Sequence, residues 1–265
     1  MVSPSGPDTD EFMGIPSSPD TDEFMDIPSS PYAGELKPNL SCVFHGFGYD
    51  QLRDDYKVIQ YISFNFHTLP TKSFLEIYSL KSNSWRMIDM DNVLFNCNFP
   101  NPFFGLEVYV DGACHWLVNK LIKDGPYEIS LLSFDLSDEV FLTTPIGKAS
   151  SFPYNRHLAV LNGSIALISS YVNEIVFQIS ILGELGVSES WIKLYTCGSF
   201  PSIQWPPIGF GKMGYIYVKK NDYELAYVNL STQIIEKIGI TGGQLCYVNV
   251  GLYKESLLSF GGSSN

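Results

Sequence analysis

The sequence has few basic residues. Lysine and arginine number 16 against 28 aspartates and glutamates, which gives a formal net charge of −12 at pH 7. Proteins bind nucleic acid largely through Lys and Arg that neutralise phosphates, so this composition argues against nucleic acid as a partner. The acidic excess is concentrated in residues 1–41, where eight acidic residues and one lysine give −7 and leave −5 for the rest. The remainder of the chain is therefore only mildly acidic.

The chain also lacks a long apolar run and an N-terminal signal. No stretch approaches the roughly 18 apolar residues that cross a bilayer. No leader with a basic start and an apolar middle opens the sequence. We therefore expect no membrane association, and we expect the protein in the cytoplasm or the nucleus.

Cysteine is scarce and widely spaced. The count is odd and no Cys-x-x-Cys pair occurs, so neither a disulfide framework nor a zinc site has support in the sequence. We expect reduced thiols that act as small buried side chains. The five residues are Cys42, Cys97, Cys114, Cys197 and Cys246.

Patterns typical of a metal site or a nucleophile are missing. The four histidines, His45, His67, His115 and His157, lie in separate segments, without the close spacing of metal ligands. There is also no GxSxG elbow and no P-loop. We therefore expect no metal and no catalytic nucleophile, and we predict that His115 is a hydrogen-bonded residue inside a sheet.

One glycine motif matches a cofactor-binding pattern on paper. Gly209, Gly211 and Gly214 have the spacing of the dinucleotide fingerprint. That fingerprint needs a strand before it and a helix after it, so that the pyrophosphate meets a helix N-terminus. Here a Pro-Pro pair precedes and a strand-like run follows. We expect no cofactor, and we predict turn glycines with positive φ.

No amphipathic helical pattern of ten or more residues is present, whereas aromatic residues make up 14% of the chain and favour strands. The organisation is clearest in residues 108–146. Asp111-Gly112 is typical of a tight hairpin turn, and a second polar turn follows at residues 135–138. Four short antiparallel strands in about forty residues form one blade-sized sheet. The predicted strands are 108–110, 114–118, 129–134 and 140–143.

This unit recurs along the chain. Gly112, Gly163 and Gly214 hold the same place in their hairpins and are each separated by 51 residues. A leucine also recurs where the third strand meets its turn, in YSLKSNSW, FDLSDEVF and VNLSTQII. A period near fifty residues with four strands each is typical of Kelch-type propeller blades. We predict an all-β, Kelch-like β-propeller of about four blades, an incomplete set, over residues 42–265.

Residues 1–41 differ from the rest. Residues 8–19 and 20–31 are a tandem repeat that differs at Gly14 and Asp26 alone. A segment rich in Pro, Ser and acids buries too little apolar surface to offset its ordering entropy, so we expect a disordered tail. It could carry phosphorylation sites or a docking motif presented twice. The alternative is a duplicated linker without a role.

Two kinds of functional residue remain. Asp135 with Asp138 and Glu139 could serve a glycosidase, although neighbouring acids in a polar turn are more often solvated. Three aromatic and proline-containing connections, residues 96–104, 151–157 and 198–207, are candidate contact loops for a protein partner, since aromatic residues and Arg dominate interfaces. The candidates are Phe103, Phe104, Tyr154, Arg156 and Trp205. Each of them could equally cap the end of the core.

Several ordered motifs resemble one family. FGYDxxxxDYKV at 47–58, EIYSLKSNSWR at 76–86, VDGACHWL at 110–117 and ISLLSFDLSDEVF at 129–141 resemble the plant F-box-associated domain of type 1, found in Kelch-like and S-locus F-box proteins. The resemblance covers about residues 42–262. It implies a non-enzymatic domain that recognises the protein to be ubiquitinated, while a separate F-box docks on a Skp-type adaptor of a cullin ligase.

The sequence departs from that family near its start. The F-box and the blade that usually precedes the FGYD motif are not found, and the acidic repeat stands in their place. The resemblance therefore implies a substrate protein as partner, with the Skp-type adaptor and cullin only where another isoform carries an F-box. A second version of this hypothesis is a chain that binds substrate proteins without delivering them to the ligase. A carbohydrate-binding or glycosidase-type β-propeller is the alternative from another class.

Overall fold

A computed structural model describes residues 14–18, 21–34, 40–64, 73–89, 97–98, 107–120, 128–146, 155–171, 174–198, 200, 202–211 and 214–241. The chain divides into two compact units. One comprises Met1–Lys37 and Tyr253–Asn265, and the other comprises Pro38–Leu252.

The first unit contains little regular structure among its described residues. Strands β1 (Gly14–Ser18) and β2 (Thr21–Asp26), one from each copy of the repeat, pair antiparallel. A single helical turn, α1 (Pro31–Gly34), follows, and the Ser30 hydroxyl accepts the Tyr32 backbone N–H at 3.1 Å. The disorder expected for residues 1–41 stays a prediction.

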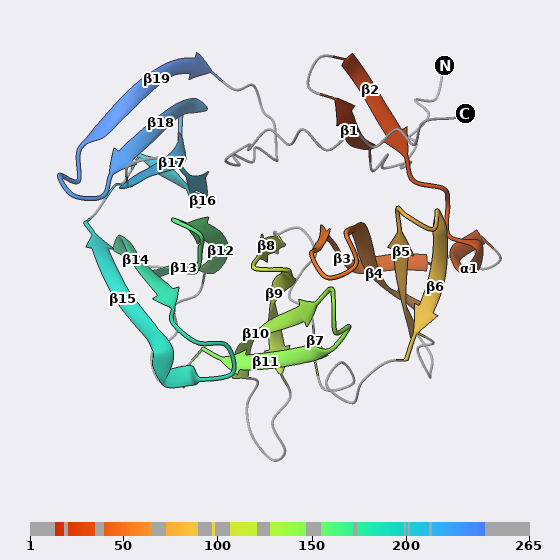
Figure 1. Cartoon of the computed structure of the whole chain (residues 1–265). Helices are drawn as coiled ribbons and strands as arrows, with labels where there is room; N and C mark the ends of the chain where they lie inside the picture. The colour runs from red at the N-terminus through yellow and green to blue at the C-terminus, as the bar shows by residue number, and fades with distance from the viewer. Residues whose placement is uncertain are drawn as a thin grey trace, which may run out of the picture. The chain divides into compact units, whose positions relative to one another are not determined.

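The described residues of the second unit form four antiparallel sheets in chain order (Figure 1). In the first, third and fourth sheets, strands that are consecutive in sequence are neighbours in space, which makes each a blade-like meander. The second sheet departs from this order only at its start, where β7 and β8 both pair with β9. The first sheet has β3 (Leu40–Asp50), β4 (Asp55–Phe64), β5 (Ser73–Ser79) and β6 (Ser84–Ile88). The second has β7 (Cys97–Asn98), β8 (Val108–Val110), β9 (Ala113–Lys120), β10 (Glu128–Asp135) and β11 (Phe141–Pro145).

The other two sheets repeat this order. The third has β12 (Asn155–Leu161), β13 (Ser164–Tyr171), β14 (Glu174–Leu182), the short 3₁₀ turn η1 (Ser188–Ser190) and β15 (Trp191–Cys197). The fourth has β16 (Ile203–Phe210), β17 (Tyr215–Lys220), β18 (Glu224–Asn229) and β19 (Ile235–Thr241). The predicted all-β fold with about four propeller-type blades is confirmed.

The recurring glycines mark equivalent hairpins. Gly112, Gly163 and Gly214 have φ of 83°, 82° and 74°, and they stand immediately before β9, β13 and β17. Asp111 and Asn162 before the first two also have positive φ, which is the type I′ turn that suits the twist of paired strands. The equal spacing in the sequence therefore reflects a glycine of positive φ that ends the first hairpin turn in three sheets, although the turn before Gly214 is longer than the other two.

The recurring leucines also hold one position. The backbone N–H groups of Leu136 and Leu230 each donate to the carbonyl of the hairpin glycine in their own sheet, Gly112 and Gly214, at 3.0 Å. Both leucines are buried, so each one ties the third strand's turn to the first hairpin and fills the core below it. Leu80 makes the matching bond to the Tyr56 carbonyl at 2.9 Å.

Three cores lie between successive sheets. The two middle sheets contribute to a core on each face, because side chains alternate along a strand. On β9, Trp116 packs with the first sheet and Leu117 with the third. On β13, Leu167 packs with the second sheet and Ile168 with the fourth. This double burial explains why the middle strands are almost continuously apolar and carry little alternation.

Strand β3 was not predicted. The sequence predicts that the propeller domain begins at residue 42 and indicates no strand there, whereas β3 begins at Leu40 and pairs along β4. Two glycines weaken the strand pattern, yet both are required by packing. A Cβ on Gly46 would overlap the Trp116 ring, and one on Gly48 would overlap the Tyr109 ring. The motif is a strand whose bare backbone receives two aromatic rings from the next sheet.

Candidate functional site

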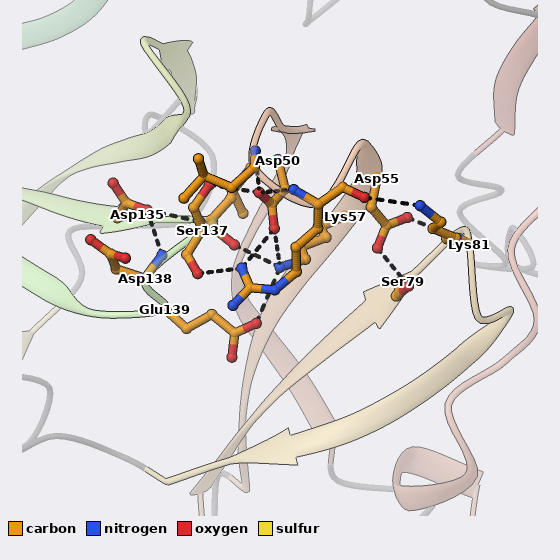
Figure 2. A network of polar contacts seen from close by, with 12 residues as sticks. Asp50, Asp55, Lys57, Ser79, Lys81, Asp135, Ser137, Asp138 and Glu139 are labelled. Atoms are coloured by element: carbon orange, nitrogen blue, oxygen red, sulfur yellow. Dashed lines mark hydrogen bonds and ion pairs between the residues drawn. The ribbon is translucent and has the colours of Figure 1, made fainter.

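A network of charged side chains joins the first two sheets (Figure 2). Its centre is Asp50, at the end of β3, whose side chain is fully buried. One carboxylate oxygen accepts the Leu52 and Arg53 backbone N–H groups and the Ser137 hydroxyl at 2.6–3.1 Å. The other lies 2.6 Å from the Lys57 ammonium and 3.0 Å from the Arg53 guanidinium. Both oxygens are thus occupied by the protein itself.

Lys57 extends the network into the second sheet. Its side chain is 4% exposed, and its ammonium also donates to the Leu136 carbonyl at 2.7 Å and to Glu139 at 3.2 Å. All three of its donors are therefore used, as a buried ammonium requires. Arg86 of β6 forms a second ion pair with Glu139. The network couples the turn after β10 to both β4 and β6.

The electrostatics keep these carboxylates charged. Burial alone raises the pKa of Asp50, but hydrogen bonds from Lys57, Ser137 and Arg53 outweigh it and hold the pKa well below its usual range. Glu139 shows the same balance: burial raises its pKa, while Arg86 and Lys57 lower it by more. Neither group is poised to exchange a proton near neutral pH, which a general acid or base needs.

The other acids of this region hold turns together. Asp135 accepts the backbone N–H groups of Ser137 and Asp138 at 2.7 and 2.8 Å, which closes the turn that follows β10. Asp55 accepts the Ser79 hydroxyl at 2.6 Å and the Lys81 backbone N–H at 2.8 Å. Asp135 and Glu139, the acids considered for a glycosidase, therefore have structural partners, and Asp138 is exposed at the turn.

His115 is a structural residue, as predicted. It is 1% exposed on β9, and its ring nitrogens lie 2.8 Å from the Ser133 hydroxyl and 3.4 Å from the Val110 carbonyl. Burial lowers its pKa to about 4, so the ring is neutral at physiological pH. It completes the hydrogen bonding of its own sheet.

The described cysteines follow the prediction, and one of the three motif glycines does. Cys114 and Cys197 are free and buried, and burial raises the pKa of both thiols. Gly214 precedes strand β17, where a dinucleotide site would need a helix. Gly209, however, lies inside β16 and pairs with Tyr217, and neither Gly209 nor Gly211 has a positive φ. The prediction of turn glycines with positive φ therefore holds for Gly214 and is wrong for the other two.

Two of the five predicted partner-contact residues lie in described strands. Arg156 is the second residue of β12, partly buried and opposite Ser169 of β13. Trp205 lies in β16, where the sequence predicted a loop. The ladder to β17 is interrupted between Gln204 and Gly209, which accommodates the two prolines at residues 206 and 207, since an edge strand or a bulge tolerates proline. Phe103, Phe104 and Tyr154 lie outside the described residues, and partner contact stays a prediction for all five.

The described parts of the chain contain no group of three or more His, Cys, Asp or Glu side chains arranged for a metal ion. Among the same residues, no helix has the length and apolar character needed to cross a membrane.

Four consecutive antiparallel sheets that share cores across their faces define a β-propeller-type repeat domain, and the charged cluster around Asp50 and Lys57 joins two of its blades. Comparison with known families agrees with this architecture. The family model described as "F-box associated beta propeller domain" matches residues 31–259. The chain therefore belongs to the F-box associated β-propeller domain family.

Curated plant proteins share this similarity. The chain is 28% identical over 170 residues to the Arabidopsis thaliana F-box protein CPR1, and 24% identical over 163 residues to the Arabidopsis thaliana F-box protein At4g22390. Each alignment covers 58% of this chain and 40% of the relative. The chain thus spans about two fifths of the length of the curated relatives it matches.

One of the solved structures that match is only distantly similar. It is a Bacteroides ovatus protein named Xyloglucan PUL GH43B, with 12% identity and a TM-score of 0.41, covering 75% of this chain and 41% of that one. A likeness at this distance carries no argument about activity.

Proposed function

We propose that this chain is the substrate-recognition module of an SCF-type ubiquitin ligase and that it acts by binding, without catalysis. The family match over residues 31–259 carries the proposal, and relatives that are named F-box proteins support it. In such a ligase an F-box engages a Skp-type adaptor and the cullin, and a second domain selects the protein to be ubiquitinated.

The geometry is compatible with this role. A module that selects proteins needs a rigid scaffold more than reactive groups, since preorganised surfaces lose less entropy on binding. Here the buried ion network and the shared cores lock adjacent sheets together. The carboxylates in the network are engaged by Lys and Arg, so they stabilise the scaffold and offer no free base.

Co-immunoprecipitation from plant tissue tests the proposal. The tagged chain is expressed alone and as a full-length isoform that carries an F-box, with and without an inhibitor of cullin activation. We expect the full-length form to recover adaptor and cullin, and we expect co-purified substrate proteins to accumulate when the inhibitor is present. Recovery of neither adaptor nor cullin by the full-length form would remove the ligase proposal.

The same experiment separates the second version, in which the chain binds substrates without delivering them. That version predicts that the short chain recovers the substrate proteins but no adaptor, and that its overexpression slows their turnover. Adaptor binding by the purified short chain would contradict it.

A further inference from the structure

One turn breaks the repeat of the four sheets. In the other three, the third strand leads into a short turn through a Leu, as at Leu80, Leu136 and Leu230. In the third sheet, residues 183–190 replace it with a longer connection between β14 and β15 that contains η1. In repeat proteins, an insertion confined to one repeat often marks a binding face.

This longer turn is rigid, because it is hydrogen-bonded within itself. The Gly183 N–H donates to the Ser190 carbonyl at 3.0 Å, and the Glu184 N–H donates to the Ser190 hydroxyl at 3.0 Å. That hydroxyl lies 2.8 Å from both the Glu184 and Val187 carbonyls. Gly186 supplies the positive φ of 82° that lets the chain reverse. The turn therefore holds its exposed side chains in fixed positions.

The turn is also anchored on the second sheet, beside β11 (Figure 1). The Gly186 N–H donates to the hydroxyl of Thr144, a fully buried residue, at 2.7 Å. The Trp191 indole donates to the Pro145 carbonyl at 3.2 Å. A Cβ built on Gly186 would lie 3.7 Å from the Leu142 side chain, so the turn is in van der Waals contact range of β11.

Large aliphatic side chains are exposed where the turn meets the second sheet. We name four of these residues, Val140, Leu142, Leu185 and Val187, the rim patch. The first two come from the start of β11 and its preceding turn, and the other two come from residues 183–190. Exposed clusters of this kind are uncommon on soluble domains and mark interaction sites. Their exposed fractions are 51% for Val140, 43% for Leu142, 40% for Leu185 and 36% for Val187.

The longer turn carries more acidic than basic side chains. Glu184 and Glu189 are exposed in the turn itself, and Lys193 is exposed near the start of β15. On the β11 side the acids lie beside arginines, since Asp138 interacts with Arg53 and Glu139 pairs with Arg86. The excess negative charge therefore lies on the turn, which favours a partner that carries positive charge next to its apolar contacts.

We infer that the rim patch binds a short segment of a partner protein that presents two or more Leu, Ile or Val side chains flanked by Lys or Arg. The aliphatic side chains bury against the four residues of the patch, and the basic flanks face Glu184 and Glu189. The identification of this partner as a ubiquitination substrate rests on the proposed function. The binding of the segment to the rim patch does not depend on that function.

Peptide selection on the purified full chain tests the inference. A random peptide library displayed on phage is panned against the chain, and the selected peptides are synthesised for affinity measurement. We expect selected sequences rich in Leu, Ile or Val together with Lys or Arg. The variant Leu185→Ser/Val187→Ser should raise the Kd about tenfold or more, as loss of an interface anchor does.

Two further variants sharpen this test. Ile234→Ser/Ile240→Ser is the matched control, since both residues are aliphatic and 56% exposed but lie in the fourth sheet. It should leave the Kd unchanged. Glu184→Gln/Glu189→Gln should weaken binding by about threefold at low salt and by less at high salt, because salt screens exposed charges.

Other outcomes overturn the inference. Selected peptides that lack basic residues, or whose affinity the turn variant does not change, would show that binding occurs elsewhere. Failure to select any peptide would also count against it. A chain that dimerises in solution and becomes monomeric in the turn variant would assign the rim patch to a second copy. If the turn variant still recovers the same inhibitor-sensitive proteins from tissue, the proposed function stands and the rim patch is not its site.

Discussion

Glu107 offers a direct test of the packing between the first two sheets. It stands just before β8, partly buried, and its carboxylate accepts the Phe47 backbone N–H from β3. Burial raises its pKa to about 7, and the Phe47 bond offsets only part of that effect. Glu107→Gln keeps an oxygen acceptor for Phe47 and removes the ionisable group. The variant therefore isolates the cost of holding a carboxylate in this position.

The sign and size of the effect follow from proton binding. Below pH 4.5, the ordinary pKa of a glutamate, both folded and unfolded chains hold the proton. Between pH 4.5 and about 7 the folded chain keeps a proton that the unfolded chain has lost, so stability falls as pH rises. The full loss is about 3 kcal/mol, at about 1.4 kcal/mol per pH unit. Because the side chain keeps some contact with solvent, this value is an upper limit.

Urea unfolding of the wild-type chain and the Glu107→Gln variant across this pH range measures the effect. We expect nearly equal free energies of unfolding near pH 4.5 and a variant that becomes progressively more stable toward pH 8. His115 and His157 titrate in both proteins and cancel in the difference. Glu184→Gln, at an exposed position, is the matched control for the loss of one glutamate carboxylate. Parallel curves for wild type and Glu107→Gln would refute the assigned burial.

Three further predictions concern other positions. Lys57→Met leaves Asp50 buried without its ammonium and should lower the free energy of unfolding by about 3–5 kcal/mol; an unchanged denaturation midpoint would contradict this. Gly163→Ala meets no neighbour within 4 Å, so its expected cost of about 1–2 kcal/mol comes from the positive φ alone and is measured by the same unfolding assay. Cys114 should resist iodoacetamide in the native chain and react after denaturation, because it is buried and its thiol pKa is raised. Mass spectrometry of the peptide that contains Cys114 measures its alkylation, and alkylation in the native chain would contradict the prediction.

The parts of the fold that were predictable are those that local sequence determines. A type I′ hairpin needs two consecutive residues with positive φ, and the adjacent residues Asp111 and Gly112 supply them. The Asp135 turn is equally local, since its carboxylate accepts backbone N–H groups two and three residues ahead. Because such signals recur at a fixed spacing, the repeat could be counted from the sequence.

The parts that were missed depend on distant residues. Gly46 and Gly48 weaken a strand pattern, and what makes them fit a strand is the pair of rings that sheet two places against them. The two prolines after Trp205 predicted a loop. However, β16 is an edge strand, and its pairing with β17 can be interrupted where the prolines lie. The spacing of residues within either segment does not reveal these contacts with other strands.

The acids after β10 show why the chemistry of a site is harder to predict than the fold. In the sequence, Asp135, Asp138 and Glu139 form one acidic cluster that suits catalysis or a solvated turn equally well. Their roles separate only when Lys57, more than seventy residues earlier, reaches Glu139 while Asp135 closes its own turn. A carboxylate held by a buried ammonium has a lowered pKa and a structural role, and one without a counter-ion remains open to solvent and partners. By the same reasoning, Glu184 and Glu189, exposed in the turn beside the rim patch, are the acids from which we expect recognition.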